Sequence, residues 1–143
     1  MKIRQITPEI FVRGNLRNVD LVDLGATVAT NKIDVIVSLV GEPISPISSW
    51  VHTYVVYPIA DSKLKLDVEV ELNELADQLT ELIKTGKKIL VNCNAGRNRS
   101  CLLIAMVLMR LKNWSGRQAL DFVREKRPNA IANPHFENFL LQQ

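Results

Sequence analysis

The sequence predicts an α/β fold with three layers, in which a mostly parallel central sheet is flanked by helices. Short apolar runs rich in β-branched residues alternate with segments whose apolar residues recur every three or four positions. The runs at residues 34–40 and 88–92 carry apolar side chains at consecutive positions, as is typical of strands covered on both faces. Strands and helices that alternate in this way form a parallel sheet with helices packed on it.

Four strands are predicted from the β-branched and aromatic runs. They lie at residues 9–13, 34–40, 53–57 and 88–92. Gly14 and Gly41 follow the first two runs, and Pro58 follows the third. Glycine favours turns and proline cannot donate a hydrogen bond to a neighbouring strand, so these residues end the strands.

Five helices are predicted between and after the strands. They cover residues 19–32, 67–84, 100–111 and about 115–125, and a last short helix begins at residue 134. We expect Asp67 to cap the second helix and Gly86 to end it. Ser115 and Gln118 have the spacing of a capping box. Asn133 followed by proline is a favourable start for the last helix.

Length and composition indicate one ordinary domain spanning residues 1–143, with 47% hydrophobic residues and no linker or repeat. The net charge of +3 is too small for a histone-like nucleic-acid binder. The longest apolar run, residues 101–109, is too short to span a bilayer, and the N-terminus lacks the apolar stretch of a secretory signal. Two cysteines make no disulfide framework. We therefore expect a cytoplasmic protein, monomeric by default, with no membrane span.

Residues 92–100 (NCNAGRNRS), here called the Cys93 loop, follow the last predicted strand. Ligands of parallel sheets bind beyond such strand ends. Gly96 allows a tight turn, and a helix that begins at Ser100 adds free N–H donors and partial positive charge. Arg99 offers a planar fork for two phosphate oxygens. The loop is therefore predicted to bind a tetrahedral oxyanion above Cys93, held as a nucleophilic thiolate. The residues expected to bind phosphate are Asn94, Ala95, Gly96, Arg97, Asn98 and Arg99.

The simplest competing interpretation makes Cys93 a small buried hydrophobic residue at a strand end. A core cysteine does not require Gly96, Arg97 and Arg99 around it, so we favour the phosphate-binding interpretation. The only two histidines, His52 and His135, show no metal-ligand spacing with each other or with Cys93. No metal or other cofactor is therefore expected.

The Cys93 loop resembles the His-Cys-x5-Arg-Ser/Thr motif of the cysteine-dependent protein tyrosine phosphatase superfamily, and in particular of its small (atypical) dual-specificity phosphatases. The resemblance extends over nearly the whole chain, including residues 35–39, 57–61 and 123–136. It implies a protein tyrosine phosphatase-like fold. It also implies hydrolysis of phosphotyrosine and phosphoserine or phosphothreonine in proteins through a phosphocysteine intermediate.

The resemblance also assigns catalytic roles. Cys93 attacks phosphorus, Arg99 and the loop N–H groups stabilise the transition state, and Ser100 hydrogen-bonds the sulfur. Asp61, in the segment Pro-Ile-Ala-Asp, protonates the leaving oxygen and then activates water. From the residues alone, a solvated loop side chain or a cap for a nearby helix is the favoured interpretation of Asp61, and only the resemblance makes it the acid. Asp67 is the fallback acid, although it fits a helix cap better.

The sequence departs from the family pattern in two places. Asn92 replaces the usual histidine before the nucleophile, and because asparagine carries no charge we expect a higher pKa for Cys93. Cys101 stands where glycine often follows Ser100; a disulfide with Cys93 is disfavoured by the geometry of adjacent loop residues. Arg97 is either a solvated side chain or an extra cation at the rim of the site. Lys63 and Lys65, which follow Asp61 closely, are likewise either solvated loop side chains or additional cations at the rim.

Other functions remain open at this stage. The same mechanism suits an RNA 5′-phosphatase or a phosphoinositide phosphatase, and Asn92 raises the alternative of a phosphate-binding pseudophosphatase without turnover. An arsenate reductase requires further redox cysteines, and a rhodanese does not explain Asp61. A phosphorylated protein is the expected substrate, with RNA or a phosphoinositide as the alternative.

Overall fold

The structure, a computed structural model, describes residues 3–16 and 20–143. In this part of the chain, five strands form one sheet in the order β1-β2-β5-β3-β4. Their bounds are β1 Arg4–Thr7, β2 Ile10–Arg13, β3 Val35–Ser38, β4 Thr53–Val56 and β5 Ile89–Asn92. Only β1 and β2 pair antiparallel, and β2, β5, β3 and β4 are parallel neighbours. The predicted mostly parallel sheet is confirmed.

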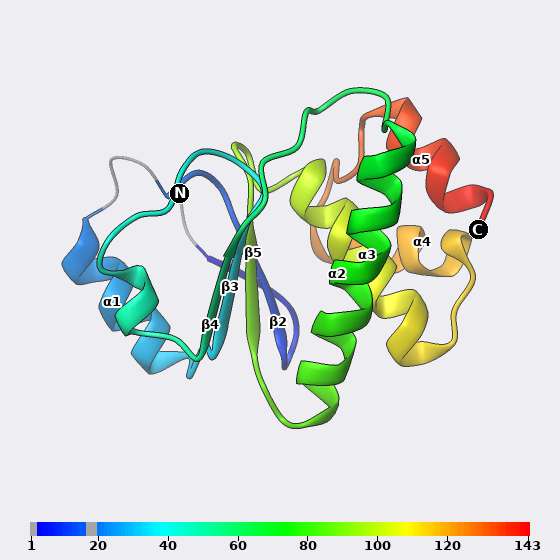
Figure 1. The fold of residues 1–143 in the computed structure, drawn as a ribbon. Helices are drawn as coiled ribbons and strands as arrows, with labels where there is room; N and C mark the ends of the chain where they lie inside the picture. The colour runs from blue at the N-terminus through cyan, green and yellow to red at the C-terminus, as the bar shows by residue number, and fades with distance from the viewer. Residues whose placement is uncertain (1–2, 17–19) are drawn as a thin grey trace.

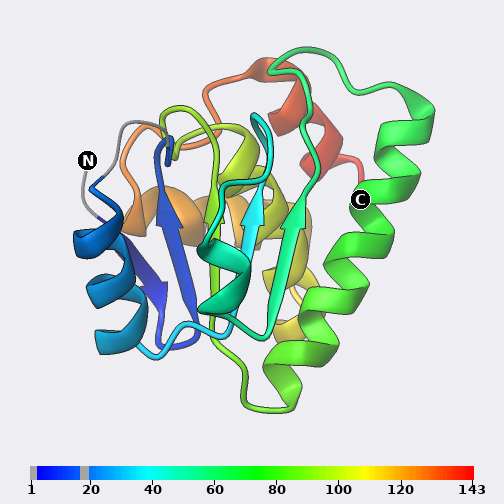
Figure 2. The ribbon, with the colours of Figure 1, turned by 60° about the vertical axis from the view of Figure 1, so that its left-hand side comes forward.

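Helices cover both faces of this sheet, which gives the three predicted layers. α1 lies on one face, together with the short 3-10 helix η1, and α2 to α5 lie on the other (Figure 1). Figure 2 shows the same sheet more nearly face-on, with its strands side by side. The helix bounds are α1 Leu21–Thr30, η1 Ile47–Ser49, α2 Leu66–Lys84, α3 Arg99–Lys112, α4 Gly116–Lys126 and α5 Pro134–Leu141.

Consecutive strand residues enter two different apolar cores. Phe11, Ile36 and Leu90 belong to the core with Leu24 and Val28 of α1. Their strand neighbours belong to the larger core with α2, α3, α4 and α5; these are Ile10, Val12, Val35, Val37, Ile89 and Val91. Side chains alternate across a strand, so only a sheet buried on both faces accepts apolar residues at every position. That is the arrangement predicted for residues 34–40 and 88–92.

Two details differ from the sequence prediction. Strand β1 was not predicted, because it is an edge strand and three of its four residues, Arg-Gln-Ile-Thr, are polar. The proposed cap Asp67 is wrong: α2 begins one residue earlier, at Leu66, after Lys65, which makes no side-chain capping bond. Asp67 lies instead within the first turn, where its negative charge favours the helix N-terminus.

Other predicted capping residues are confirmed, although α3 (Arg99–Lys112) extends one residue beyond its predicted bounds at each end and α1 ends at Thr30, before the predicted residue 32. Ser115 and Gln118 form the reciprocal capping box of α4. The Asn133 side chain accepts a hydrogen bond from the first turn of α5, and Gly86 takes a left-handed conformation (φ 94°) after α2. The predicted first helix began at residue 19, which lies outside the described residues; α1 is capped by Asp20.

The strand register brings the loops of the site together. Arg13 at the end of β2 and Ser38 at the end of β3 are both register partners of Asn92 at the end of β5. The chain after β4 continues along this edge, because the N–H of Ile59 donates to the carbonyl of Leu39. The loops that follow these four parallel strands therefore lie side by side at the carboxyl-terminal ends of the strands. Across the described part of the chain, no helix has the length and apolar character needed to cross a membrane.

Candidate active site

The Cys93 loop packs against the end of strand β2. Gly96 has a φ of 61°, which side chains disfavour. A β-carbon at this position would lie 2.8 Å from the carbonyl carbon of Arg13 and 3.0 Å from the nitrogen of Gly14. The backbone N–H of Cys93 donates to the Arg13 carbonyl at 3.4 Å. Glycine is therefore required here both for conformation and for space, and the loop is fixed relative to the sheet.

The sulfur of Cys93 is buried, and the groups around it favour its ionised form. The side chain of Cys93 is 2% exposed, and its Sγ lies 3.1 Å from the hydroxyl oxygen of Ser100. Burial raises the pKa of the thiol, but hydrogen bonds from the Ser100 side chain and from the N–H groups of Ser100, Arg97 and Gly96 oppose it. The net result is a pKa for Cys93 below its ordinary value. A thiolate is the nucleophilic form of cysteine.

The carbonyl groups of the same loop face away from the sulfur. Arg127 donates from Nε to the carbonyl of Gly96 at 3.1 Å and from Nη2 to that of Ala95 at 3.4 Å. The carbonyl of Arg97 accepts from the N–H of Ile131 at 2.9 Å. In a trans peptide the C=O and the next N–H point in opposite directions, so holding these carbonyls outward aims the N–H groups at the sulfur. No local sequence pattern connects Arg127 with the loop, so this contact was not predicted.

Arg99 begins α3 and reaches across to the segment after β4. Its Nη1 donates to the carbonyl of Ile59 at 3.0 Å. Its Nε is buried and has no hydrogen-bond partner among the described residues. Arg99 and Asn94 line a hollow of about 280 Å³ together with Pro58, Ile59 and residues after β2 and β3. A buried guanidinium N–H without a partner is costly, which makes this hollow suited to an anion.

Asp61 lies against the Cys93 loop although 32 residues separate it from Cys93 along the chain. Its Oδ2 accepts a hydrogen bond from Nδ2 of Asn98 at 2.9 Å, and its Oδ1 accepts one from Nδ2 of Asn133 at 2.7 Å. The fallback acid Asp67 is in the first turn of α2, and no hydrogen bond among the described residues joins it to the loop. Asn133 was predicted only as a helix cap; its bond to Asp61 was not foreseen.

Asn92 is 1% exposed, and its amide turns toward β3. Its Nδ2 donates to the hydroxyl oxygen of Ser38 at 3.1 Å, and that hydroxyl donates to the carbonyl of Val40 at 2.8 Å. The Oδ1 of Asn92 is buried without a partner among the described residues. Asn92 thus links the ends of β5 and β3, and none of the groups that lower the pKa of Cys93 is its side chain.

The remaining candidate residues differ in burial and in contacts. Arg97 is half-buried and donates from Nε to the carbonyl of Asn129 at 2.8 Å. Lys63 and Lys65 are exposed. Cys101 is fully buried behind the loop, and burial together with the neighbouring Cys93 raises its pKa to about 12. Cys101 is therefore an unreactive thiol at neutral pH.

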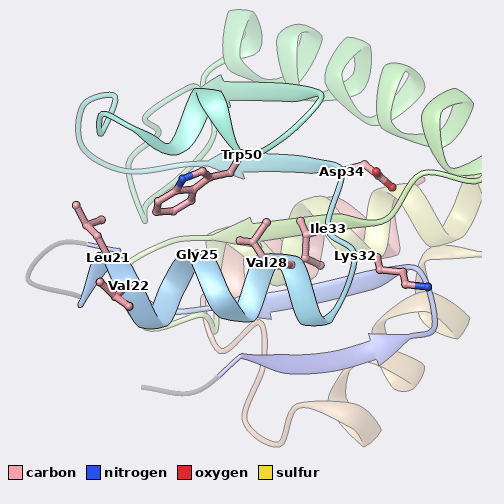
Figure 3. Close-up of a pocket in the computed structure, with 9 residues that line it drawn as sticks. Leu21, Val22, Gly25, Val28, Lys32, Ile33, Asp34 and Trp50 are labelled. Carbon is pink, nitrogen blue, oxygen red and sulfur yellow. The ribbon is translucent and has the colours of Figure 1, made fainter.

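A second hollow, of about 560 Å³, lies between α1 and Trp50 on the opposite side of the sheet from α2 (Figure 3). The stick view shows Trp50 facing α1 near Gly25, with Lys32 and Asp34 at the far end. None of the predicted site residues lines this second hollow. Within residues 3–16 and 20–143, no group of three or more His, Cys, Asp or Glu side chains is arranged to hold a metal ion.

Residues 22–143 match the family described as dual specificity phosphatase, catalytic domain. The chain is 31% identical over 144 residues to MAP kinase phosphatase with leucine-rich repeats protein 3 of Dictyostelium discoideum, covering 96% of this chain and 15% of that protein. It is 31% identical over 85 residues to human dual specificity protein phosphatase 5, covering 59% of this chain and 22% of that protein. The chain therefore spans less than a quarter of the length of these two relatives.

Two solved structures share the fold over nearly the whole chain. Human DUSP28 superposes with a TM-score of 0.81 at 22% identity, covering 99% of this chain and 94% of that one. PTP-2 phosphatase of Cydia pomonella also gives a TM-score of 0.81, at 23% identity, covering 98% of this chain and 88% of that one. The predicted protein tyrosine phosphatase-like fold is confirmed.

Proposed function

Because the chain belongs to the dual specificity phosphatase family, we propose that it hydrolyses phosphate monoesters of proteins through a phosphocysteine intermediate. The observation that carries this proposal is the buried Cys93 sulfur, 3.1 Å from the Ser100 hydroxyl oxygen. Burial raises the pKa of Cys93, but hydrogen bonds from that hydroxyl and from N–H groups of the Cys93 loop lower it by more. These donors suit the oxygens of a bound phosphate as well as they suit a thiolate.

In the first step, the Cys93 thiolate attacks phosphorus in line with the leaving oxygen. The S–P bond forms as the P–O bond to the leaving group breaks, and a proton moves from Asp61 to that oxygen. Arg99 and the N–H groups of the loop residues 94–99 stabilise the charge on the other phosphoryl oxygens. The buried Nε of Arg99, which has no partner among the described residues, supports this assignment.

In the second step, water attacks the phosphorus of the intermediate. Asp61, now a carboxylate, takes a proton from that water, and the S–P bond breaks to release inorganic phosphate. The hydroxyl of Ser100, 3.1 Å from the sulfur, stabilises the departing thiolate. Asp61 is thereby protonated again and the cycle closes without a metal ion or a redox reaction.

The proposed substrates are proteins phosphorylated on tyrosine and on serine or threonine. Arg97 supports an additional preference for anionic groups beside the scissile phosphate, because only its Nε has a partner among the described residues and the side chain is half-exposed at the rim. RNA 5′-phosphates and phosphoinositides are the substrates that would exploit the same cation. We place the protein in the cytoplasm, where a thiol nucleophile stays reduced; both cysteines are free thiols.

The test is inorganic phosphate release from a matched panel of substrates. The panel holds phosphotyrosine and phosphothreonine peptides, a phosphoinositide and a 5′-triphosphate RNA, with Cys93→Ser as the blank. We expect release from both peptides that Cys93→Ser abolishes. Faster phosphate release from the RNA or the lipid would support the same mechanism but would show that a protein is not the preferred substrate.

The competing function is that of a phosphate-binding module without turnover, which Asn92 suggests by replacing the charged histidine of the family motif. The lowered pKa of Cys93 speaks against it, since hydrogen bonds to the sulfur favour the thiolate without a neighbouring histidine. An unperturbed thiol is half ionised at about pH 8.5. If no substrate released phosphate at any pH up to that value, the proposed enzymatic activity would be wrong and a phosphate-binding module would be the better interpretation.

A further inference from the structure

We infer that Asn98 and Asn133 are positioning residues that hold the Asp61 carboxyl group against the Cys93 loop through both stages of the reaction. The inference rests on the proposed function. It assigns a role to two residues for which the sequence suggested only a loop N–H donor and a helix cap.

The orientation of each amide is fixed by a backbone N–H. Oδ1 of Asn98 accepts from the N–H of Ala132 at 2.8 Å, and Oδ1 of Asn133 accepts from the N–H of His135 at 2.9 Å. Only the oxygen of an amide accepts a hydrogen bond, so each backbone N–H determines which end is nitrogen. Both NH₂ groups are thereby turned toward Asp61.

The two amides reach the carboxyl group from different parts of the fold. Asn98 is the residue before α3, within the Cys93 loop, and it binds Oδ2 of Asp61 at 2.9 Å. Asn133 is the residue before α5, 72 positions from Asp61, and it binds Oδ1 at 2.7 Å. Asp61 itself is exposed on a loop between β4 and α2. Among the described residues, these two hydrogen bonds are the only ones that restrain the Asp61 side chain.

The neutrality of the two donors suits a group that gives up a proton and later recovers it. A cation beside Asp61 would stabilise the carboxylate and oppose its protonation. An amide N–H donates to a carboxylate oxygen and also to the oxygen of a protonated carboxyl group. No ion pair among the described residues involves Asp61. Asn98 and Asn133, here called the clamp, therefore hold the Asp61 carboxyl group in place in both protonation states. Because Asn98 directly precedes Arg99, the clamp also fixes Asp61 relative to the Cys93 loop.

The test uses Asn98→Ser and Asn133→Ser with two aryl phosphates of different leaving ability. Serine lacks the amide donor but is itself a favourable N-cap, so α5 keeps its start. Phenoxide is a poor leaving group and needs the acid, whereas p-nitrophenoxide needs it less. We expect kcat on phenyl phosphate to fall about tenfold in each variant, with a smaller loss on p-nitrophenyl phosphate and little change in KM. Asn138→Ser, exposed on α5, is the matched control and keeps wild-type values.

A second set of variants separates positioning from general loosening of the site. In an Asp61→Asn background, the two serine substitutions are expected to cause no further loss, because they act only through Asp61. Equal losses on both aryl phosphates, or additive losses in that background, would overturn the inference. If Asn133→Ser fails to fold, Asn133→Thr keeps a neutral helix cap and removes the NH₂ group, so the same comparison applies.

The outcomes distinguish this inference from the proposed function. Wild-type turnover that Cys93→Ser abolishes, combined with unchanged kinetics of both asparagine variants, would overturn the clamp and leave the phosphatase standing. Absence of turnover by the wild type would overturn the phosphatase, and the catalytic role of the clamp with it.

Discussion

At the scale of single residues, the chemistry of the site depends on a balance at one sulfur atom. Burial alone would raise the pKa of Cys93, and hydrogen bonds to the sulfur lower it further than burial raises it. Neutral donors therefore favour the thiolate here, since Asn92 supplies no charge. The same burial without enough donors leaves Cys101 with a pKa of about 12. Two cysteines separated by eight positions thus have opposite reactivity for physical reasons.

The first prediction concerns Ser100→Ala. Loss of the hydroxyl removes one of the hydrogen bonds that lower the pKa of Cys93, so that pKa rises. A higher pKa leaves less thiolate at a given pH, and the acidic limb of the kcat/KM profile moves to higher pH. The measurement is the pH dependence of iodoacetamide alkylation, followed at Cys93 by mass spectrometry. An alkylation profile equal to that of the wild type would contradict the assigned contact.

The second prediction concerns Asn92→His, which restores the residue of the family motif. An imidazolium next to the nucleophile stabilises the thiolate by charge, so we expect the pKa of Cys93 to fall and the acidic limb to move to lower pH. Thiolate absorbance in the ultraviolet, recorded as a function of pH, measures the change, with Asn138→His as control. A titration identical to that of the wild type would show that the missing charge has no effect on this site.

At the scale of elements, the space available at a glycine shows how closely neighbouring segments approach one another. A β-carbon at Gly116, the first residue of α4, would lie 1.7 Å from the carbonyl oxygen of Leu140 in α5. The same atom at Gly25 in α1 would make an ordinary contact, 3.4 Å from the ring of Trp50. Sequence patterns identify both as glycines near or within helices but do not distinguish them. The difference comes from backbone that is remote in sequence.

The third prediction compares these two glycines. Gly116→Ala forces α4 and α5 apart and is expected to lower the free energy of unfolding by about 1–3 kcal/mol, the usual cost of overpacking. Gly25→Ala replaces a glycine inside a helix where space exists, and is expected to raise it by about 0.5–1 kcal/mol. Urea unfolding followed by circular dichroism measures both. A stable Gly116→Ala protein would contradict the close packing of α4 on α5.

The fourth prediction concerns the Cys93 loop as an element. Gly96→Ala places a β-carbon 2.8 Å from the Arg13 carbonyl carbon at a left-handed backbone position, so the loop must move away from β2. A displacement of about 1 Å costs on the order of 100-fold in rate. We expect kcat on p-nitrophenyl phosphate to fall by that factor while the far-ultraviolet circular dichroism stays unchanged. Wild-type kcat in Gly96→Ala would show that the loop tolerates the shift.

At the scale of the whole molecule, the sequence predicted the three layers and the position of the Cys93 loop after the end of a parallel strand. It also predicted three of the four proposed helix start or stop signals: the Ser115–Gln118 box, Asn133 and Gly86, but not Asp67. It did so because a buried strand, a capping box and an Asn-Pro helix start are local patterns. Contacts that join distant segments were not predictable in this way. The bonds from Arg127 to the loop carbonyls and from Asn133 to Asp61 link residues 31 and 72 positions apart. Asp61 itself was assigned by family resemblance, not by its own surroundings.

The fifth prediction uses stability of the whole chain as a readout of the anion site. A ligand that binds only the folded state stabilises it, by about 2.7 kcal/mol at a concentration 100 times its Kd. Inorganic phosphate is therefore expected to raise the Tm in proportion to the logarithm of its concentration. Arg99→Met removes the buried Nε and is expected to abolish the rise, whereas Lys84→Met on exposed α2 surface is expected to keep it. A phosphate-independent Tm in the wild type would contradict an anion site at Arg99.

The central claim is that Cys93 becomes covalently phosphorylated during turnover. The most direct measurement is rapid acid quenching of the wild-type protein with p-nitrophenyl phosphate, followed by peptide mass spectrometry. We predict one phosphoryl group per chain on the peptide that contains Cys93, absent from Cys93→Ser and enriched in Asp61→Asn, where water is no longer activated. Turnover with no phosphoryl group on Cys93, or with the group on another residue, would contradict the account.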